Sequence, residues 1–128
     1  MPGYEADDRW LEAAFDAVET AAEDACRAIA EHSQVLLRAG SYARSGYPAT
    51  LVVRRLMADG LRDRRMAAGI AMQRYETATL ELRAALIRHL VDHDRVSLAE
   101  AGRMFGVSRQ RAGRIYSDHR PCEPADAK

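Results

Sequence analysis

Apolar residues recur at intervals of three and four along most of the chain, which is the period of an α-helix. Between about Asp7 and Ala39 they form a sustained heptad seam, in which His32 is a polar interruption: Leu11, Phe15, Val18, Ala22, Ala25, Ile29, His32 and Leu36. A seam of this length suits burial inside a helical bundle and self-association as a coiled coil equally well. Gly40 follows the last apolar residue, so we predict that the helix ends there.

Residues 40–48 are rich in turn-forming residues, and Pro48 suits the first turn of a following helix. A short apolar helix is expected next, until Asp59 and Gly60 break it. Its inward positions are expected to be Leu51, Val52 and Leu56.

A second long helix is predicted from Leu61 to Asp92. Its apolar stripe again alternates by four and three: Met66, Ile70, Gln73, Thr77, Leu80, Ala84, Ile87 and Val91. No stretch alternates at the period of two that a β-strand needs. Two long seams joined by a connection predict an antiparallel helical hairpin or half of a dimeric bundle.

The segment from Ser97 to Tyr116 has the pattern of two short helices around a tight turn. Ser97 and Glu100 form a capping box, so a helix should begin at Ser97. Gly106 can adopt the left-handed conformation that ends this helix, and Ser108 can cap the next one. Inward positions are Leu98, Ala101, Met104, Phe105, Ala112 and Ile115. This layout predicts a helix-turn-helix.

The outward face of the second short helix is polar and basic: Arg109, Gln110, Arg111, Gly113 and Arg114. Arginine in a first helical turn is unfavourable by about 0.3–1 kcal/mol, because the helix dipole is positive there. A phosphate at this helix end would remove the conflict. The alternative is an ordinary solvated face, since nearly every basic residue of this chain is arginine.

Residues 97–116 resemble the helix-turn-helix of region four of bacterial sigma factors, which reads the upstream promoter element. The matching positions are Leu98, Gly102, Gly106, Val107, Ser108, Arg109, Arg111 and Ile115. With the preceding helix, the resemblance covers roughly a third of the chain. Gln110 stands where the family usually has an acid, and Gly113 where it usually has arginine, so the promoter preference is not carried over. The sequence has no recognisable counterpart of region two, which a sigma factor needs to melt a promoter, so a complete sigma factor is not expected.

Charge is divided along the chain, although the formal net charge is zero. Residues 1–40 carry −6, residues 41–94 carry +3 and residues 95–120 carry +4. This division suggests an acidic half that serves assembly and a basic half that binds an anion. The chain has no apolar run long enough for a membrane span and no secretory signal at its N-terminus, so we expect a cytoplasmic, nucleoid-associated protein.

Candidate catalytic or metal chemistry is weak. His89 and His93 lie four apart, but no third ligand is evident, and a solvated helix end is the simpler interpretation. Cys26 and Cys122 lack metal-ligand spacing. No nucleophile–base set or phosphate-binding loop stands at a characteristic spacing. We therefore expect neither an enzyme nor a cofactor.

Together these patterns predict an all-α protein with a long helical hairpin or coiled-coil-like N-terminal part and a C-terminal helix-turn-helix. Residues 1–75 are expected to be a dimerisation or interaction region, 76–120 the DNA-binding domain and 121–128 a flexible tail. The expected function is sequence-specific, DNA-binding transcriptional regulation, with a recognition helix at about 108–117 in the major groove. The expected contacts to bases or phosphates come from Arg103, Ser108, Arg109, Gln110, Arg111, Gly113 and Arg114. Tyr116, His119 and Arg120 are either further phosphate contacts or a frayed end.

The expected partners are double-stranded DNA and a second copy of the chain. The homodimer seam is predicted to consist of Leu11, Phe15, Val18, Ala22, Ile29 and Leu36. The alternative is an interaction module that binds RNA polymerase, a sigma factor or another regulator, with DNA contact secondary. A monomer with an exposed seam would favour that alternative. A bundle that senses a small molecule between its long helices is a third possibility, consistent with the polar residues in the stripes.

Overall fold

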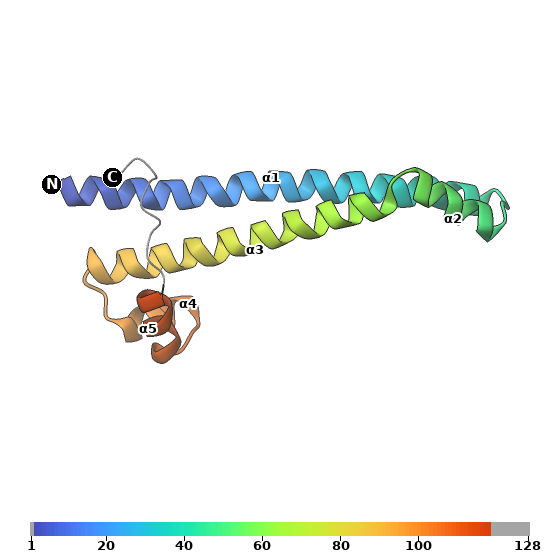
Figure 1. Ribbon diagram of the computed structural model, residues 1–128. Helices are drawn as coiled ribbons and strands as arrows, with labels where there is room; N and C mark the ends of the chain where they lie inside the picture. The colour runs from blue at the N-terminus through green and yellow to red at the C-terminus, as the bar shows by residue number, and fades with distance from the viewer. Residues whose placement is uncertain (1, 119–128) are drawn as a thin grey trace. The chain divides into compact units, whose positions relative to one another are not determined.

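The structure, a computed structural model, describes residues 2–118, with side chains from Arg9 onward. This part of the chain forms five α-helices and no strand (Figure 1), so the expected all-α class is confirmed. The helices are α1 (Pro2–Arg44), α2 (Ala49–Ala58), α3 (Leu61–Asp92), α4 (Leu98–Phe105) and α5 (Arg109–Asp118). None of the described helices combines the length and the apolar character that a membrane crossing needs.

The end of α1 differs from the prediction. Gly40 lies inside the helix, which continues to Arg44. The left-handed residue is Gly46, at φ 86°, and its N–H donates to the Ala43 carbonyl over 3.1 Å. Gly40 was the wrong choice because a single glycine can remain helical at a cost of about 1 kcal/mol, and the positive φ that commonly ends a helix is adopted by Gly46 instead.

Helices α2 and α3 have the predicted limits. Gly60, at φ 81°, separates them, and Asp59 ends α2 with its N–H bonded to the Arg55 carbonyl. The expected inward face of α2 is correct only in part. Val52 and Leu56 are half-buried, but Leu51 is 44 % exposed. Val52 and Leu56 lie four residues apart on one face of α2, whereas Leu51 lies on the neighbouring face, where it lines a surface cavity with Tyr42 and Tyr47.

The chain divides into two compact units. The hairpin unit is Glu19–Glu76, in which the end of α1, α2 and the start of α3 lie together (Figure 1). Arg64 of α3 donates to Glu31 of α1 over 2.7 Å inside this unit. The helix-turn-helix unit combines the residues up to Val18 with those from Thr77 onward. The predicted functional boundary near residue 75 stays a prediction.

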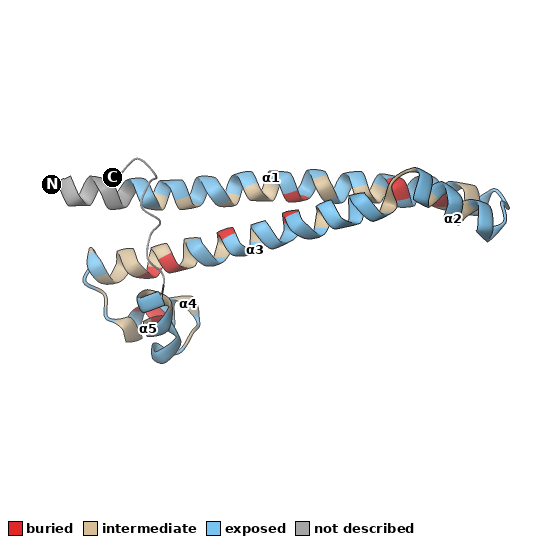
Figure 2. Cartoon of the chain, viewed as in Figure 1, coloured by how far each residue is buried: buried red, intermediate tan, exposed pale blue. Residues whose placement is uncertain are grey.

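Buried and half-buried residues recur along one side of α1 (Figure 2). They form a regular stripe: Leu11, Ala14, Val18, Ala21, Ala25, Ala28, His32, Val35, Ala39 and Tyr42. The predicted dimer seam shares only part of this stripe. Leu11 and Val18 belong to the stripe, and Ala22 is half-buried beside it. Phe15, Ile29 and Leu36 lie on the next flank of the helix, where they are 50 %, 41 % and 46 % exposed. The single chain therefore covers one side of the apolar band and leaves the other open.

The predicted stripe of α3 also contains both buried and exposed residues. Ala84 and Ile87 are buried, and Ile87 is the largest fully buried side chain described. Earlier in the helix, Met66, Ile70 and Leu80 remain exposed. Most buried hydrophobic residues of the described chain are alanines, which let helix backbones approach closely but remove little apolar surface from water. Much of the larger apolar surface therefore remains exposed in the single chain.

Candidate nucleic-acid interface

Helix α4 begins and ends as its sequence predicts. The Ser97 hydroxyl oxygen accepts the Glu100 N–H at 3.1 Å, which satisfies one of the free donors of the first turn. Gly106 adopts φ 69° and ψ 26°, and its N–H donates to the Arg103 carbonyl. The Glu100 carboxylate binds Arg103 on the next turn of α4.

The turn between the two short helices is held by Gly102. Its carbonyl accepts the Val107 N–H at 2.8 Å. A Cβ atom at position 102 would lie 2.8 Å from the Val107 carbonyl oxygen and 3.2 Å from that of Ser108. Only glycine permits this close approach of α4 to the turn. Ala101 and Ala112 are fully buried where the two helices cross, so small residues set their spacing.

Helix α5 starts at a second serine cap. The Ser108 hydroxyl oxygen accepts the Arg111 N–H at 3.1 Å, as predicted. This bond uses the oxygen as an acceptor and leaves the hydroxyl proton available for a further acceptor. The start of the proposed recognition helix is therefore fixed locally, by one side chain and one backbone group.

The other end of α5 is anchored to α3. The Tyr116 hydroxyl donates to Asp92 Oδ1 at 2.6 Å, and Arg88 Nη1 donates to the Tyr116 carbonyl oxygen at 2.7 Å. The Arg88 guanidinium lies 4.7 Å from the centre of the Tyr116 ring and forms an ion pair with Asp92 at 3.7 Å. Tyr116 is thus an anchor, which corrects its assignment as a phosphate contact or frayed end. His119 and Arg120 lie outside the described residues.

The anchor has an electrostatic consequence for Tyr116. Its pKa is raised above 10.0 chiefly by the hydrogen bond to Asp92, then by burial and by the negative charge of Asp92, while Arg88 opposes the shift. The neutral phenol is therefore the form that holds α5. Sequence reasoning missed Arg88 and Asp92, although their spacing of four residues on one helix was a usable signal.

The outer face of α5 carries three arginines without an acidic partner. Arg109, Arg111 and Arg114 are exposed, and none forms an ion pair with a described residue. Gln110 is exposed between them. No acidic residue occurs between Glu100 and Asp118, so the positive charge is not neutralised along this helix.

Two other residues that the sequence predicted as DNA contacts, Gly113 and Arg103, are less free than the exposed arginines of α5. Gly113 is half-buried, and a Cβ atom there would lie 3.9 Å from Leu98 Cδ1, so this position borders α4 instead of facing fully outward. Arg103 is exposed but already paired with Glu100. The central outward positions of α5 are consequently Gln110 and Arg114, which are four residues apart on one face.

His89 and His93 lie side by side near the end of α3. The rings of His89 and His93 are 4.8 Å apart and tilted by 36°. No group of three His, Cys, Asp or Glu side chains that could hold a metal ion occurs among the described residues.

No protein-family model, curated protein or solved structure matches this chain. The chemistry of the α5 surface has to be deduced from its own residues and geometry.

Proposed function

We propose that this chain is a sequence-specific DNA-binding transcriptional regulator that inserts α5 into the major groove. One observation carries the proposal: three unpaired arginines stand on the exposed face of a short helix that is capped at its start and anchored near its end. A rigid, basic, solvent-facing helix next to a tight turn is the arrangement that reads DNA in helix-turn-helix proteins. The resemblance to sigma region four supports the same conclusion.

The electrostatics of α5 favour an anion at its N-terminus. Arg109 and Arg111 lie in the first turn, where each is disfavoured by about 0.3–1 kcal/mol at the positive end of the helix dipole. No acidic residue lies in that turn to offset them. A DNA phosphate near this end would convert the unfavourable interaction into favourable ones, and would release counterions from the DNA.

The roles of the outward residues follow from their positions. Gln110 and Arg114 occupy the centre of the exposed face, so they are assigned to base edges. Glutamine matches adenine and arginine matches guanine through paired hydrogen bonds, each worth about 1–3 kcal/mol of discrimination. The flanking residues Arg109, Arg111 and Ser108 are assigned to phosphates, which fix the register of the helix on the duplex.

Arg103 is assigned a weaker phosphate contact. Its ion pair with Glu100 lies on the surface, where such pairs contribute about 0–1 kcal/mol. Exchange of Glu100 for a phosphate is therefore feasible at small cost. The gain is correspondingly smaller than for an arginine with no partner to give up.

Assembly as a homodimer is part of the proposal. Phe15, Ile29 and Leu36 lie at multiples of seven residues along α1, and each is about half exposed in the single chain. A second copy would bury this flank and double the number of DNA contacts, which raises both affinity and site length. A nucleoid-associated protein in the cytoplasm fits this role.

The same exposed flank is the observation that favours the alternative function. If the chain is a monomer in solution, Phe15, Ile29 and Leu36 would instead receive another protein, such as RNA polymerase or a sigma factor. DNA contact by α5 would then be secondary. The oligomeric state of the purified chain, measured by analytical ultracentrifugation, separates the two functions.

The decisive experiment is selection of the purified protein against a random pool of duplex DNA at near-physiological salt. An enriched inverted repeat supports a dimeric sequence-specific regulator and gives its half-site spacing. Binding that shows no enrichment and collapses as salt rises would limit the chain to non-specific phosphate contact.

Arg114→Ala then tests the recognition helix on the selected site. We expect a loss of about 1–3 kcal/mol in binding and a relaxed preference at one base position. Arg65→Ala is the matched control, because Arg65 is an exposed arginine on α3 without an ion pair to a described residue. Equal effects of the two variants would contradict the assignment of Arg114.

A further inference from the structure

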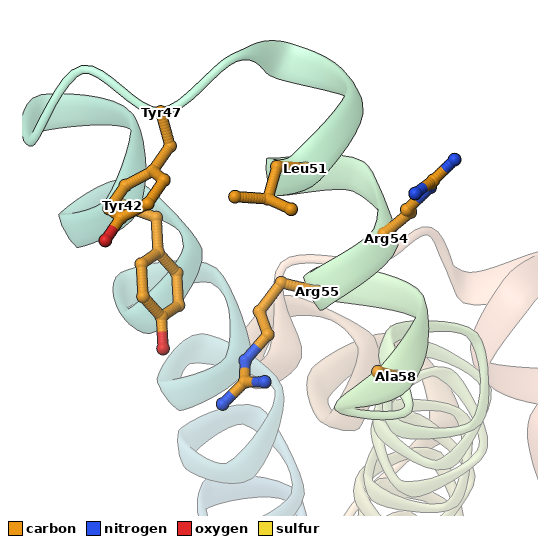
Figure 3. Close-up of a pocket in the computed structure, with 6 residues that line it drawn as sticks. All are labelled: Tyr42, Tyr47, Leu51, Arg54, Arg55 and Ala58. Atoms are coloured by element: carbon orange, nitrogen blue, oxygen red, sulfur yellow. The ribbon is translucent and has the colours of Figure 1, made fainter.

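A surface cavity of about 340 Å³ lies in the hairpin unit, beside α2. Its walls come from the last turns of α1, the connection to α2 and α2 itself (Figure 3). The lining residues are Tyr42, Tyr47, Leu51, Arg54, Arg55 and Ala58. This volume is within the range of about 300–1,000 Å³ that small-molecule sites occupy.

Two aromatic rings and one aliphatic side chain form the apolar part of the cavity. The rings of Tyr42 and Tyr47 meet edge to face, with centres 5.6 Å apart and planes at 87°. Leu51 extends from α2 toward them (Figure 3). Tyr47 is 48 % exposed and Leu51 is 44 % exposed. A flat apolar group could cover both side chains and gain the free energy of removing that surface from water.

The charged part of the cavity is positive. Two of its six lining residues are arginines and none is acidic. Arg55 extends beside Tyr42, with its guanidinium carbon 5.6 Å from the ring centre, whereas Arg54 extends away from the tyrosines (Figure 3). A bound anion in the cavity would therefore meet Arg55 first.

The guanidinium of Arg55 has N–H donors that make no hydrogen bond to a described residue. Its one ion pair joins Nε to Asp59 Oδ2 at 4.0 Å, beyond hydrogen-bond length, and Asp59 is shared with Arg38 at 3.8 Å. The Tyr42 and Tyr47 hydroxyls likewise have no hydrogen-bond partner among the described residues. A carboxylate could thus take two parallel hydrogen bonds from the guanidinium without displacing any.

We propose that this cavity binds a small aromatic carboxylate. The ring of the ligand lies against Tyr47 and Leu51, and its carboxylate accepts hydrogen bonds from Arg55. The site belongs entirely to the hairpin unit and does not depend on DNA binding by α5. It also differs from a pocket between the two long helices, because α2 and the α1–α2 connection supply most of its walls.

The test is calorimetric titration of the full chain with 2-naphthoate, without DNA. We expect saturable binding of one naphthoate per chain, and binding of the uncharged analogue 2-naphthamide weaker by about tenfold or more, since a charge-assisted hydrogen bond is lost. Arg55→Gln should weaken naphthoate binding by a similar factor. Arg65→Gln is the matched control, because it removes the same charge from an exposed arginine of the hairpin unit that does not line the cavity. It should change the affinity by no more than about threefold.

Circular dichroism and thermal unfolding show whether Arg55→Gln keeps its fold. If that variant unfolds, Tyr47→Ala serves instead, because Tyr47 is 48 % exposed and lies in the connection between α1 and α2, outside both helices. We expect it to weaken naphthoate binding several-fold. Absence of saturable binding, equal affinities for naphthoate and naphthamide, or unchanged binding in a folded Arg55→Gln or Tyr47→Ala variant would each overturn the proposal.

Discussion

Replacing Gly102 by alanine tests the geometry of the helix-turn-helix most directly. The new methyl group would lie 2.8 Å from the Val107 carbonyl oxygen, well inside the 3.4 Å at which ordinary van der Waals contact begins. The obstructing atoms belong to the backbone of the turn, and Val107 is also hydrogen-bonded to the Gly102 carbonyl. The turn can therefore relieve the overlap only by moving away from α4.

Two opposing contributions set the size of the effect. Alanine in place of glycine inside a helix is favourable by about 1 kcal/mol. Overpacking of a tight contact costs about 1–3 kcal/mol, and the cost tends to the upper part of that range when backbone atoms must shift. We expect Gly102→Ala to lower the free energy of unfolding of the helix-turn-helix unit by about 1–2 kcal/mol.

Gly113→Ala is the matched control in the same motif. Its Cβ atom would lie 3.9 Å from Leu98 Cδ1, which is ordinary contact, so only the gain in helix propensity remains. We expect this variant to be more stable by about 0.5–1 kcal/mol. Chemical unfolding followed by circular dichroism measures both changes on the full chain. Opposite signs for the two glycines are the expected result.

The reasoning would be refuted if Gly102→Ala stabilised the protein as much as Gly113→Ala. That result would mean that α4 and the turn are farther apart than described. Titration of both variants with the selected DNA adds a functional result. If Gly113→Ala is more stable yet binds DNA more weakly, Gly113 is required for close approach of α5 to the duplex.

Tyr116→Phe removes the hydrogen bond to Asp92 and should destabilise the docking of α5 by about 1 kcal/mol in chemical unfolding; an unchanged midpoint would argue against the anchor. Because the raised pKa favours the neutral phenol in the folded state, the Tyr116 contribution should be present below pH 10.0 and disappear as pH rises through the folded-state pKa. Comparison of the wild type with Tyr116→Phe across that range measures it, and a pH-independent difference would contradict this sign. Phe15→Glu should convert the proposed dimer to a monomer in analytical ultracentrifugation and weaken DNA binding together, whereas loss of neither would show that Phe15 is not at an interface.

The sequence by itself determined the features that depend on neighbouring residues. Helix α3 has its predicted limits, and both serine caps and the left-handed Gly106 are where the capping pattern places them. These features arise from hydrogen bonds and dihedral angles within one turn of chain, so a short window of sequence contains the information. The basic outer face of α5 was predictable for the same reason.

Only the tertiary structure decided which side of each helix is covered. A heptad stripe sets a direction around one helix but not its partner, so the separation of covered Val18 from exposed Phe15 had to come from packing. The anchoring of Tyr116 by Arg88 and Asp92 joins residues more than twenty positions apart. The need for glycine at position 102 depends on where the following turn passes. Contacts of this kind are fixed by the three-dimensional approach of separate segments, which local sequence rules do not contain.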